Sequence, residues 1–254
     1  MRAEVFSPAT RFSTLSRCKL RPSVQIACEN RIVLFDRDPK QQGDEIPGPH
    51  GLPGDVIVSP DTRRPNRIPP GQSRTKKWPV LDASGPPRID SANWRLQLSG
   101  LLRNEISLTY DQFQKLPRVR VFADFHCVTR WSRLDNVWSG VSTREIARLA
   151  GVKPEAKFVL ALAYDYGWTT NVPLEYFLKE DSLFAWAHDG QPIAPEHGGP
   201  VRLIIPQLYA WKSAKWVKGV RFLEQDQAGF WEEGGYHMRG VPWGPGDGER
   251  FRWS

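Results

Sequence analysis

The sequence has few cysteines and no long hydrophobic run. Cys18, Cys28 and Cys127 are its only cysteines among 254 residues, and no two of them have the close spacing of a zinc knuckle or a dithiol redox motif. So few cysteines exclude a disulfide framework and are typical of a reducing compartment, so we expect a cytoplasmic protein. No stretch of 18 apolar residues is present and the N-terminus lacks the apolar core of a signal peptide, so we expect no membrane span.

Several common functional motifs are missing as well. The absence of a Gly-x-Ser-x-Gly elbow argues against an α/β-type serine hydrolase, and the absence of Gly-x-Gly-x-x-Gly after a strand argues against a dinucleotide-binding fold. No recognisable nucleic-acid-binding motif occurs, so we expect no nucleic-acid partner. No Cys-x-x-Cys-His haem attachment occurs either, which means that electrons for any redox reaction come from a separate partner.

What is present is a basic, aromatic-rich chain of globular composition. The net charge is +7, and the sequence contains 11 Trp and 12 Phe at 40% hydrophobic content. A positive balance suits an anionic ligand, although a basic solvated surface explains it equally well. Aromatic side chains of this bulk commonly form cores and pocket walls.

The composition divides the chain into three parts. Residues 1–46 are expected to be a poorly structured leader. Residues 47–71 contain seven Pro and four Gly, which predicts a linker or a wrapping arm. The folded domain is then expected at 72–254, with one short strand possible before it at 31–35.

Short strands outnumber short helices within the domain. Thr109 with Gln112, and Ser142 with Glu145, have the spacing of capping boxes, and Gly151 is placed to end the second helix. Apolar patterns predict strands at 94–98, 119–127, 158–164, 168–172, 183–188, 201–205 and 217–223. Because the strands and helices do not alternate regularly, we predict a mixed α+β fold rather than a doubly wound parallel sheet.

The first candidate site is centred on Cys127, where a buried strand is expected to end. The run His-Cys-Val-Thr-Arg-Trp-Ser-Arg covers 126–133. Arg130 and Arg133 lie close to the cysteine in sequence, and cations favour the thiolate, which is a nucleophile and a soft metal ligand. A small buried core residue is the competing interpretation of Cys127.

The second candidate site is a basic segment at 197–221. Five Lys or Arg and no acid occur between His197 and Leu223. Gly198 and Gly199 allow close approach of a ligand to the backbone, and Arg and Lys side chains complement a phosphate. A solvated basic edge remains an alternative, but the interleaved aromatic residues favour a walled groove.

These runs together resemble one known family. The matching stretches are His-Cys-Val-Thr-Arg-Trp-Ser at 126–132, His-Gly-Gly-Pro-Val-Arg-Leu at 197–203, Tyr-Ala-Trp-Lys-Ser-Ala-Lys-Trp at 209–216, and the tail at 229–243. With them the chain, from about residue 70 onward, resembles the sulfite-oxidase-like molybdopterin-binding oxidoreductases. The resemblance implies a strand-rich α+β sulfite-oxidase-type fold with short helices, and a cofactor of molybdopterin carrying molybdenum.

The resemblance also implies roles for individual residues. Cys127 is the implied metal ligand, with Arg130 beside it as a second catalytic residue. The implied cofactor-binding residues are His126, His197, Arg202, Tyr209, Lys212, Ser213, Ala214 and Lys215. A family Thr that contacts the pterin falls on Ala163, so that contact is not expected here.

The expected function is therefore two-electron oxygen-atom transfer on a small molecule, with sulfur compounds as the expected class. The alternative is a non-catalytic protein that binds an anion or a nucleotide in the basic groove at 197–221. A separate electron-transfer partner is implied, and a monomer is the default. Trp131 replaces an Arg that follows the metal-binding Cys in sulfite oxidases, which favours a substrate less charged than sulfite.

Overall fold

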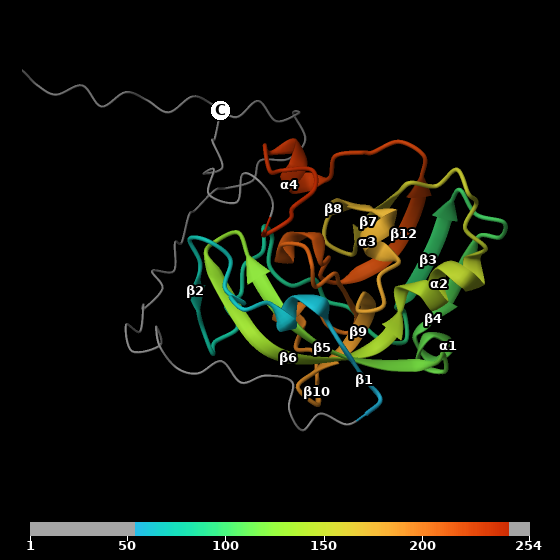
Figure 1. The fold of residues 1–254 in the computed structure, drawn as a ribbon. Helices are drawn as coiled ribbons and strands as arrows, with labels where there is room; N and C mark the ends of the chain where they lie inside the picture. The colour runs from blue at the N-terminus through green and yellow to red at the C-terminus, as the bar shows by residue number, and fades with distance from the viewer. Residues whose placement is uncertain (1–53, 244–254) are drawn as a thin grey trace, which may run out of the picture. The chain divides into compact units, whose positions relative to one another are not determined.

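The computed structural model describes residues 54–243, which form two β-sheets with short helices between and around the strands (Figure 1). The α+β, strand-rich fold with short helices is therefore confirmed. The leader expected at 1–46 and the strand considered at 31–35 lie outside the described residues. None of the helices within 54–243 has the length and apolar character to cross a membrane.

The larger sheet contains seven strands of the described chain, in the order β1-β5-β6-β9-β10, with β2 added to β6 and β11 to β9. Their bounds are β1 Val56–Val58, β2 Ser73–Arg74, β5 Arg118–Cys127, β6 Trp131–Ser142, β9 Leu183–His188, β10 Gln191–Pro192 and β11 Arg202–Ile204. β5 and β6 form a long antiparallel hairpin. Its ladder is shifted between Ala123 and Phe125, and Asp135 on the opposite strand takes a positive φ of 62° there.

The smaller sheet has five strands in the order β4-β3-β12-β7-β8. They span Arg95–Gly100 (β3), Ile106–Thr109 (β4), Phe158–Ala163 (β7), Thr169–Pro173 (β8) and Val217–Leu223 (β12). β12 is the central strand, and it pairs parallel with β3 and antiparallel with β7. The mixed pairing agrees with the absence of a regular strand–helix alternation in the sequence.

The helices are short, as predicted. They are α1 Tyr110–Gln114, α2 Thr143–Ala150, α3 Leu174–Phe177, α4 Phe230–Glu233 and the 3₁₀ turns η2 Pro60–Arg63, η3 Pro195–His197 and η4 Ala210–Lys212. The capping box predicted at Thr109 and Gln112 is confirmed. The box predicted at Ser142 is only half right, because Ser142 caps α2 through the amide of Arg144 while Glu145 pairs with Arg148 at 2.7 Å. Gly151, with φ 61°, ends α2 as predicted.

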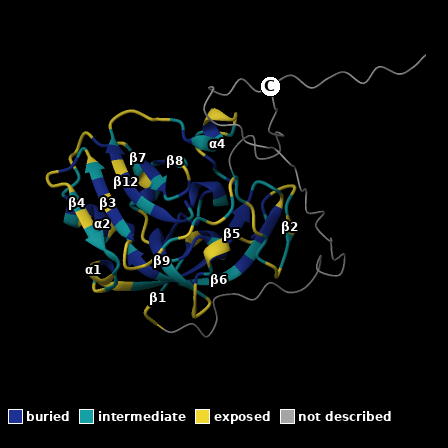
Figure 2. Cartoon of the chain, turned by 180° about the vertical axis from the view of Figure 1, so that it is seen from behind, coloured by how far each residue is buried: buried dark blue, intermediate teal, exposed yellow. Residues whose placement is uncertain are grey.

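The apolar core lies between the sheets and the helices that cover them (Figure 2). Trp94, Phe113, Phe177 and Phe222 are fully buried in its larger part. A second cluster, around Phe125, Trp138 and Cys127, lies along the β5–β6 hairpin. Cys127 is therefore part of a buried wall, and the end of β5 is held in place by large aromatic side chains.

The described part of the Pro-rich segment, residues 54–71, packs on the larger sheet. β1 pairs with residues Arg120–Phe122 of β5. Farther along, the guanidinium of Arg67 is buried and forms ion pairs with Asp124 at 2.5 Å and with Asp135 at 2.6 Å. These contacts fasten the segment across the hairpin whose tip carries Cys127.

The Arg67 ion pairs predict a large effect of mutation. Arg67→Ala should lower the free energy of unfolding by about 3 kcal/mol, because it leaves the buried Asp124 carboxylate without its partner. Urea unfolding followed by tryptophan fluorescence measures this. Arg120→Ala, which removes an exposed ion pair with Asp55, is the matched control and should have a smaller effect. Equal losses in the two variants would contradict the structural role given to Arg67.

Candidate active site

Cys127 is the last residue of β5, and a tight turn places its side chain. The amide of Arg130 donates to the Cys127 carbonyl at 3.0 Å, and β6 begins at Trp131, directly opposite Cys127 in the ladder. Arg130 takes the left-handed conformation with φ 72°, the geometry that often closes a three-residue hairpin loop. Because side chains alternate along a strand, Phe125 and Cys127 share one face of β5.

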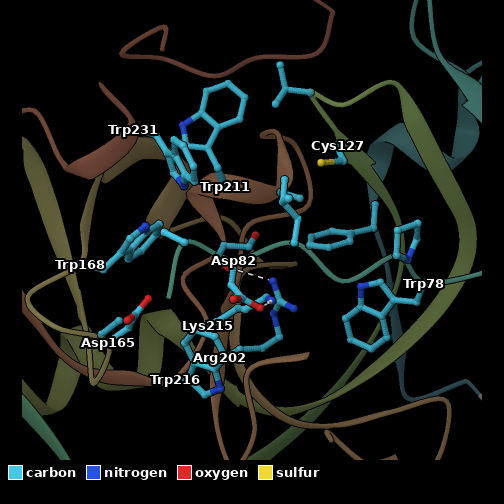
Figure 3. A pocket seen from close by; sticks show the side chains of 18 of the residues that line it. Trp78, Asp82, Cys127, Asp165, Trp168, Arg202, Trp211, Lys215, Trp216 and Trp231 are labelled. Atoms are coloured by element: carbon cyan, nitrogen blue, oxygen red, sulfur yellow. Dashed lines mark hydrogen bonds and ion pairs between the residues drawn. The ribbon is translucent and has the colours of Figure 1, made fainter. Parts of the chain in front are cut away.

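That face forms one wall of a pocket (Figure 3). The aromatic side chains that line it are Trp78, Phe125, Trp131, Trp168, Trp211, Trp216, Trp231 and Tyr236. Its charged lining residues are Asp82, Asp165, Arg202 and Lys215. Figure 3 shows Trp211 and Trp231 on one side of the pocket and Arg202, Lys215 and Trp216 on another, so the pocket has an aromatic part and a cationic part.

Cys127 is a buried thiol under two opposing influences. Burial raises its pKa, whereas the Thr129 hydroxyl, which donates to Sγ at 3.1 Å, and the positive charges of Lys215 and Arg202 lower it. Burial is the larger effect, so the thiol is protonated at neutral pH when nothing is bound to it. A soft metal cation bound at Sγ would replace the proton and stabilise the thiolate.

Arg202 and Lys215 carry the positive charge of the pocket. Arg202 is 3% exposed and donates to the carbonyls of His197 at 2.6 Å and Ser213 at 2.9 Å, while its Nε is buried without a partner. Burial lowers the pKa of Arg202 to about 9, and burial together with the charge of Arg202 lowers the pKa of Lys215 to about 8. Lys215 lies 3.6 Å from the carboxylate of Asp82.

His197 lies beside this charged pair. Its ring stacks on Trp78 with the centroids 3.9 Å apart, and its Nδ1 is buried without a partner. Burial and the charges of Arg202 and Lys215 lower its pKa to about 4, so it is neutral at pH 7. The two unpartnered nitrogens, Arg202 Nε and His197 Nδ1, are the kind of buried polar atom that a bound ligand satisfies.

Gly198 and Gly199 allow close contacts between backbone segments next to Lys215. A Cβ on Gly198, which has φ 103°, would come within 2.9 Å of the Lys215 Cα, and a Cβ on Gly199 would come within 2.0 Å of the Ile193 carbonyl. The motif therefore needs glycine at both positions. Ser213 completes this side of the pocket, with its Oγ accepting from the Ile205 amide at 3.0 Å.

Four of the residues predicted from sequence line the pocket: Cys127, Arg202, Ser213 and Lys215. His197 joins them through its stacking on Trp78, which is itself a lining residue.

The other five predicted residues are placed elsewhere. His126 lies on the opposite face of β5, where its Nδ1 is 2.9 Å from the Ser132 hydroxyl, and Arg130 is exposed at the turn. Lys212 is fully buried in an ion pair with Glu232. Tyr209 stacks on Trp211, and Ala214 is buried in the core.

Sequence reasoning missed most of the pocket wall. Trp78 and Asp82 come from the segment before β3, Trp168 from the β7–β8 turn, and Trp231 and Tyr236 from the C-terminal part of the described chain. The 11 Trp of the sequence were one signal, and the matching tail at 229–243, which contains Trp231 and Tyr236, was another, but neither says which side chains meet.

The donor set fits a cofactor that carries both an anionic group and a soft metal. The unpartnered nitrogens of Arg202 and His197, the ammonium of Lys215 and the hydroxyl of Ser213 suit phosphate oxygens. Cys127 supplies a sulfur ligand on another wall of the same pocket. Within residues 54–243 no cluster of three or more His, Cys, Asp or Glu side chains suited to a metal ion occurs.

Comparison with known proteins agrees with this fit. The family model described as oxidoreductase molybdopterin binding domain matches residues 83–231, more than half of the 254 residues. A protein described as uncharacterized oxidoreductase YuiH, from Bacillus subtilis (strain 168), is 49% identical over 189 residues, which is 74% of this chain and 93% of that protein.

More distant similarities cover smaller shares. A putative protein-methionine-sulfoxide reductase subunit, YedZ1, from Azospira oryzae is 30% identical over 153 residues, 60% of this chain and 57% of that protein. The crystal structure of the sulfane dehydrogenase SoxCD from Paracoccus pantotrophus is similar with a TM-score of 0.54 and 22% identity, over 57% of this chain and 42% of that chain. The structural similarity concerns the fold.

The lowered pKa of Lys215 predicts pH-dependent anion binding. Sulfate, whose charge does not change between pH 6 and 10, should bind with full affinity below pH 8 and more weakly as pH rises through 8, because Lys215 then loses the charge that attracts it. Between pH 7 and 9 the loss should approach about tenfold. Calorimetric titration measures it, and Lys215→Arg, which keeps its charge, should flatten the profile up to about pH 8, above which Arg202 also begins to lose its charge. An unchanged profile in Lys215→Arg would mean that another group titrates.

Proposed function

Because this chain belongs to the oxidoreductase molybdopterin-binding domain family, we propose that it catalyses two-electron oxygen-atom transfer on a small, weakly charged substrate, with S-oxides and N-oxides as the expected class. The chain is a molybdenum-cofactor-dependent oxidoreductase, so the proposal concerns its reaction and its substrate. Family membership favours catalysis over the alternative of non-catalytic anion binding. The observation that carries the proposal is that Cys127 lies in a pocket with an aromatic wall.

The aromatic wall suits a polar but uncharged substrate. Trp168, Trp211, Trp231 and Tyr236 contribute it, on a different side from Arg202 and Lys215. An S–O or N–O bond places positive charge on sulfur or nitrogen and on the methyl groups attached to it. Aromatic faces are electron-rich and attract such groups. A dianion such as sulfate, the product of sulfite oxidation, needs converging cations instead.

The cationic side chains of the pocket are placed to hold the cofactor rather than the substrate. Arg202, Lys215, Ser213 and His197 are the residues that would hold the cofactor's phosphate. Arg130, the cation expected next to the metal ligand, is exposed at the hairpin turn. Two aromatic pocket-lining residues accompany Cys127 on the hairpin: Phe125 shares its face of β5, and Trp131 pairs with it on the opposite strand. The putative methionine-sulfoxide reductase subunit among the relatives supports an S-oxide substrate.

Some residues of the pocket would hold the cofactor, and others would contact the substrate. Cys127 would give a thiolate ligand to the metal, which holds that end of the cofactor against the β5–β6 hairpin. When bound, the molybdenum cofactor supplies the two-electron redox change. Reduction of an S-oxide breaks the S–O bond, consumes two electrons and two protons, and releases the sulfide and water. The electrons come from a separate electron-transfer partner.

Tyr236 completes the aromatic wall of the pocket. Burial raises the pKa of its hydroxyl, which therefore stays protonated and uncharged at neutral pH. Its ring is packed against Trp211 and Trp231, with centroids 5.2 and 5.1 Å away. A cytoplasmic location and a monomeric state remain predictions from the sequence.

Replacing the metal ligand should abolish activity. Cys127→Ser should leave the fold intact but remove turnover and change the visible spectrum of the purified protein, because a hydroxyl is a harder and poorer ligand than a thiolate for this metal. Activity, absorption spectra and molybdenum content measure this, with Cys28→Ser as the control cysteine. Wild-type turnover and spectrum in Cys127→Ser would show that Cys127 does not bind the metal.

The substrate class should appear in a paired assay on one molybdenum-loaded preparation. Dimethyl sulfoxide, methyl phenyl sulfoxide and trimethylamine N-oxide are offered with a reduced dye, and sulfite is offered with an artificial electron acceptor. We expect turnover of at least one oxide and slower oxidation of sulfite, because the wall near Cys127 is aromatic. Rapid sulfite oxidation without oxide reduction would reverse the proposed direction, and no turnover in either assay would refute the proposed substrate class.

A further inference from the structure

Behind the aromatic wall of the pocket, one buried carboxylate joins three elements of the chain. Glu232 Oε1 accepts hydrogen bonds from Thr170 Oγ1 at 3.0 Å, from Trp211 Nε1 at 2.8 Å and from Lys212 Nζ at 2.6 Å. Its Oε2 accepts from the Gly229 amide at 3.1 Å. The side chains of both Glu232 and Lys212 are 0% exposed.

This carboxylate fixes the indole of Trp211. The ring of Trp211 lines the pocket, while its N–H is directed to Glu232. Tyr209 stacks on the ring at a centroid distance of 5.2 Å. An indole has a single N–H donor, so one bond to an immobile acceptor sets the rotation of the whole ring.

Glu232 also belongs to the segment that supplies the rest of the wall. Trp231, the residue before it in α4, lines the pocket, and Tyr236 packs on Trp231 and on Trp211. The same segment is fastened to β8 through Asn171, whose Nδ2 donates to the Met238 carbonyl at 3.1 Å and to Asp226 at 2.8 Å. The part of the wall formed by Trp211, Trp231 and Tyr236 is therefore shared between two segments, and Glu232 lies in one and is hydrogen-bonded to the other.

The match to the family model ends at Trp231, one residue before this carboxylate. Glu232 thus joins residues of the matched region, including Thr170 and Trp211, to the segment that follows it. A buried carboxylate with four donors is highly constrained, because each donor left without its acceptor would carry a desolvation penalty.

We propose that Glu232 is a positioning residue that sets substrate affinity by holding Trp211, and with it the aromatic wall, in one orientation. This inference rests on the proposed function, since it assumes that the substrate contacts that wall. Lys212 neutralises the carboxylate in the core. A wall held rigid before binding loses little conformational entropy when substrate arrives, which favours binding.

The test compares two double variants that both remove the buried charges. Glu232→Gln with Lys212→Met keeps an oxygen acceptor for Trp211, whereas Glu232→Leu with Lys212→Met removes it. Trp211→Phe removes the donor and keeps an aromatic ring. Removing both charges together avoids leaving a lone buried ion, which alone could prevent folding.

The first readout is steady-state kinetics with methyl phenyl sulfoxide, normalised to molybdenum content. KM should be about tenfold higher in the Leu double variant than in the Gln double variant, which corresponds to about 1.4 kcal/mol of lost binding, with kcat changed much less. Trp211→Phe should raise KM on its own but add little in the Leu background. Equal KM values in the two double variants, or an additive effect of Trp211→Phe, would overturn the proposal.

The second readout needs no substrate. The indole N–H resonance of Trp211, assigned by its absence in Trp211→Phe, should exchange slowly with solvent in the wild type and the Gln double variant, and faster in the Leu double variant. If the indole N–H exchanges faster in the Leu double variant but no oxide is turned over, the proposed function is refuted while the positioning of the ring by Glu232 is supported. If its exchange is the same in both double variants, Glu232 does not hold the ring, whatever the substrate.

Discussion

A buried guanidinium without an acidic partner is the constraint on which this site depends. Arg202 sits in a strand of the larger sheet and donates to two backbone carbonyls, but no carboxylate of residues 54–243 forms an ion pair with it. Burying a cation in such surroundings costs free energy unless an anion binds beside it and balances its charge. The neighbouring Lys215, the neutral His197 and the glycines that let the chain close there are all consistent with one anionic ligand.

The buried charge of Arg202 also suggests different roles for the cationic side and the aromatic side of the pocket. In the proposed arrangement the cationic side would hold the cofactor, and the aromatic side would be left for the substrate. Cys127 lies on the face of β5 that also carries Phe125, and the burial that makes its free thiol a weak acid also shields a bound metal from water. Redox chemistry and substrate contact can then take place in an environment of low polarity, where each remaining dipole has a larger effect.

Buried ion pairs outside the pocket connect the segments that form its walls. Arg67 ties the Pro-rich segment to Asp124 and Asp135 on the hairpin, and Lys212 with Glu232 ties the C-terminal segment to η4. Both pairs are buried, and both connect segments that are far apart in sequence. The aromatic wall and the β5–β6 hairpin that carries Cys127 are thus each held by an ion pair located behind the residues that line the pocket.

Several features were determined by the sequence itself. Apolar runs specified the strands at 183–188 and 217–223, and the Thr109 and Gly151 signals specified helix ends, because these depend on neighbours within a few residues. The Cys127 motif and the motif of Arg202 and Lys215 also named three residues that line one pocket, since each motif is a compact run with its own chemistry.

The tertiary structure alone decided which side chains enter the pocket. Lys212 and Lys215 are three residues apart, yet the first turns into the core toward Glu232 and the second into the pocket. Arg130 is exposed because its left-handed backbone points it away from Cys127, and His126 faces the other side of the strand. Side-chain direction at the end of a strand depends on the turn and on packing partners far along the chain. The aromatic wall depends on such partners entirely, because it is assembled from three separate segments.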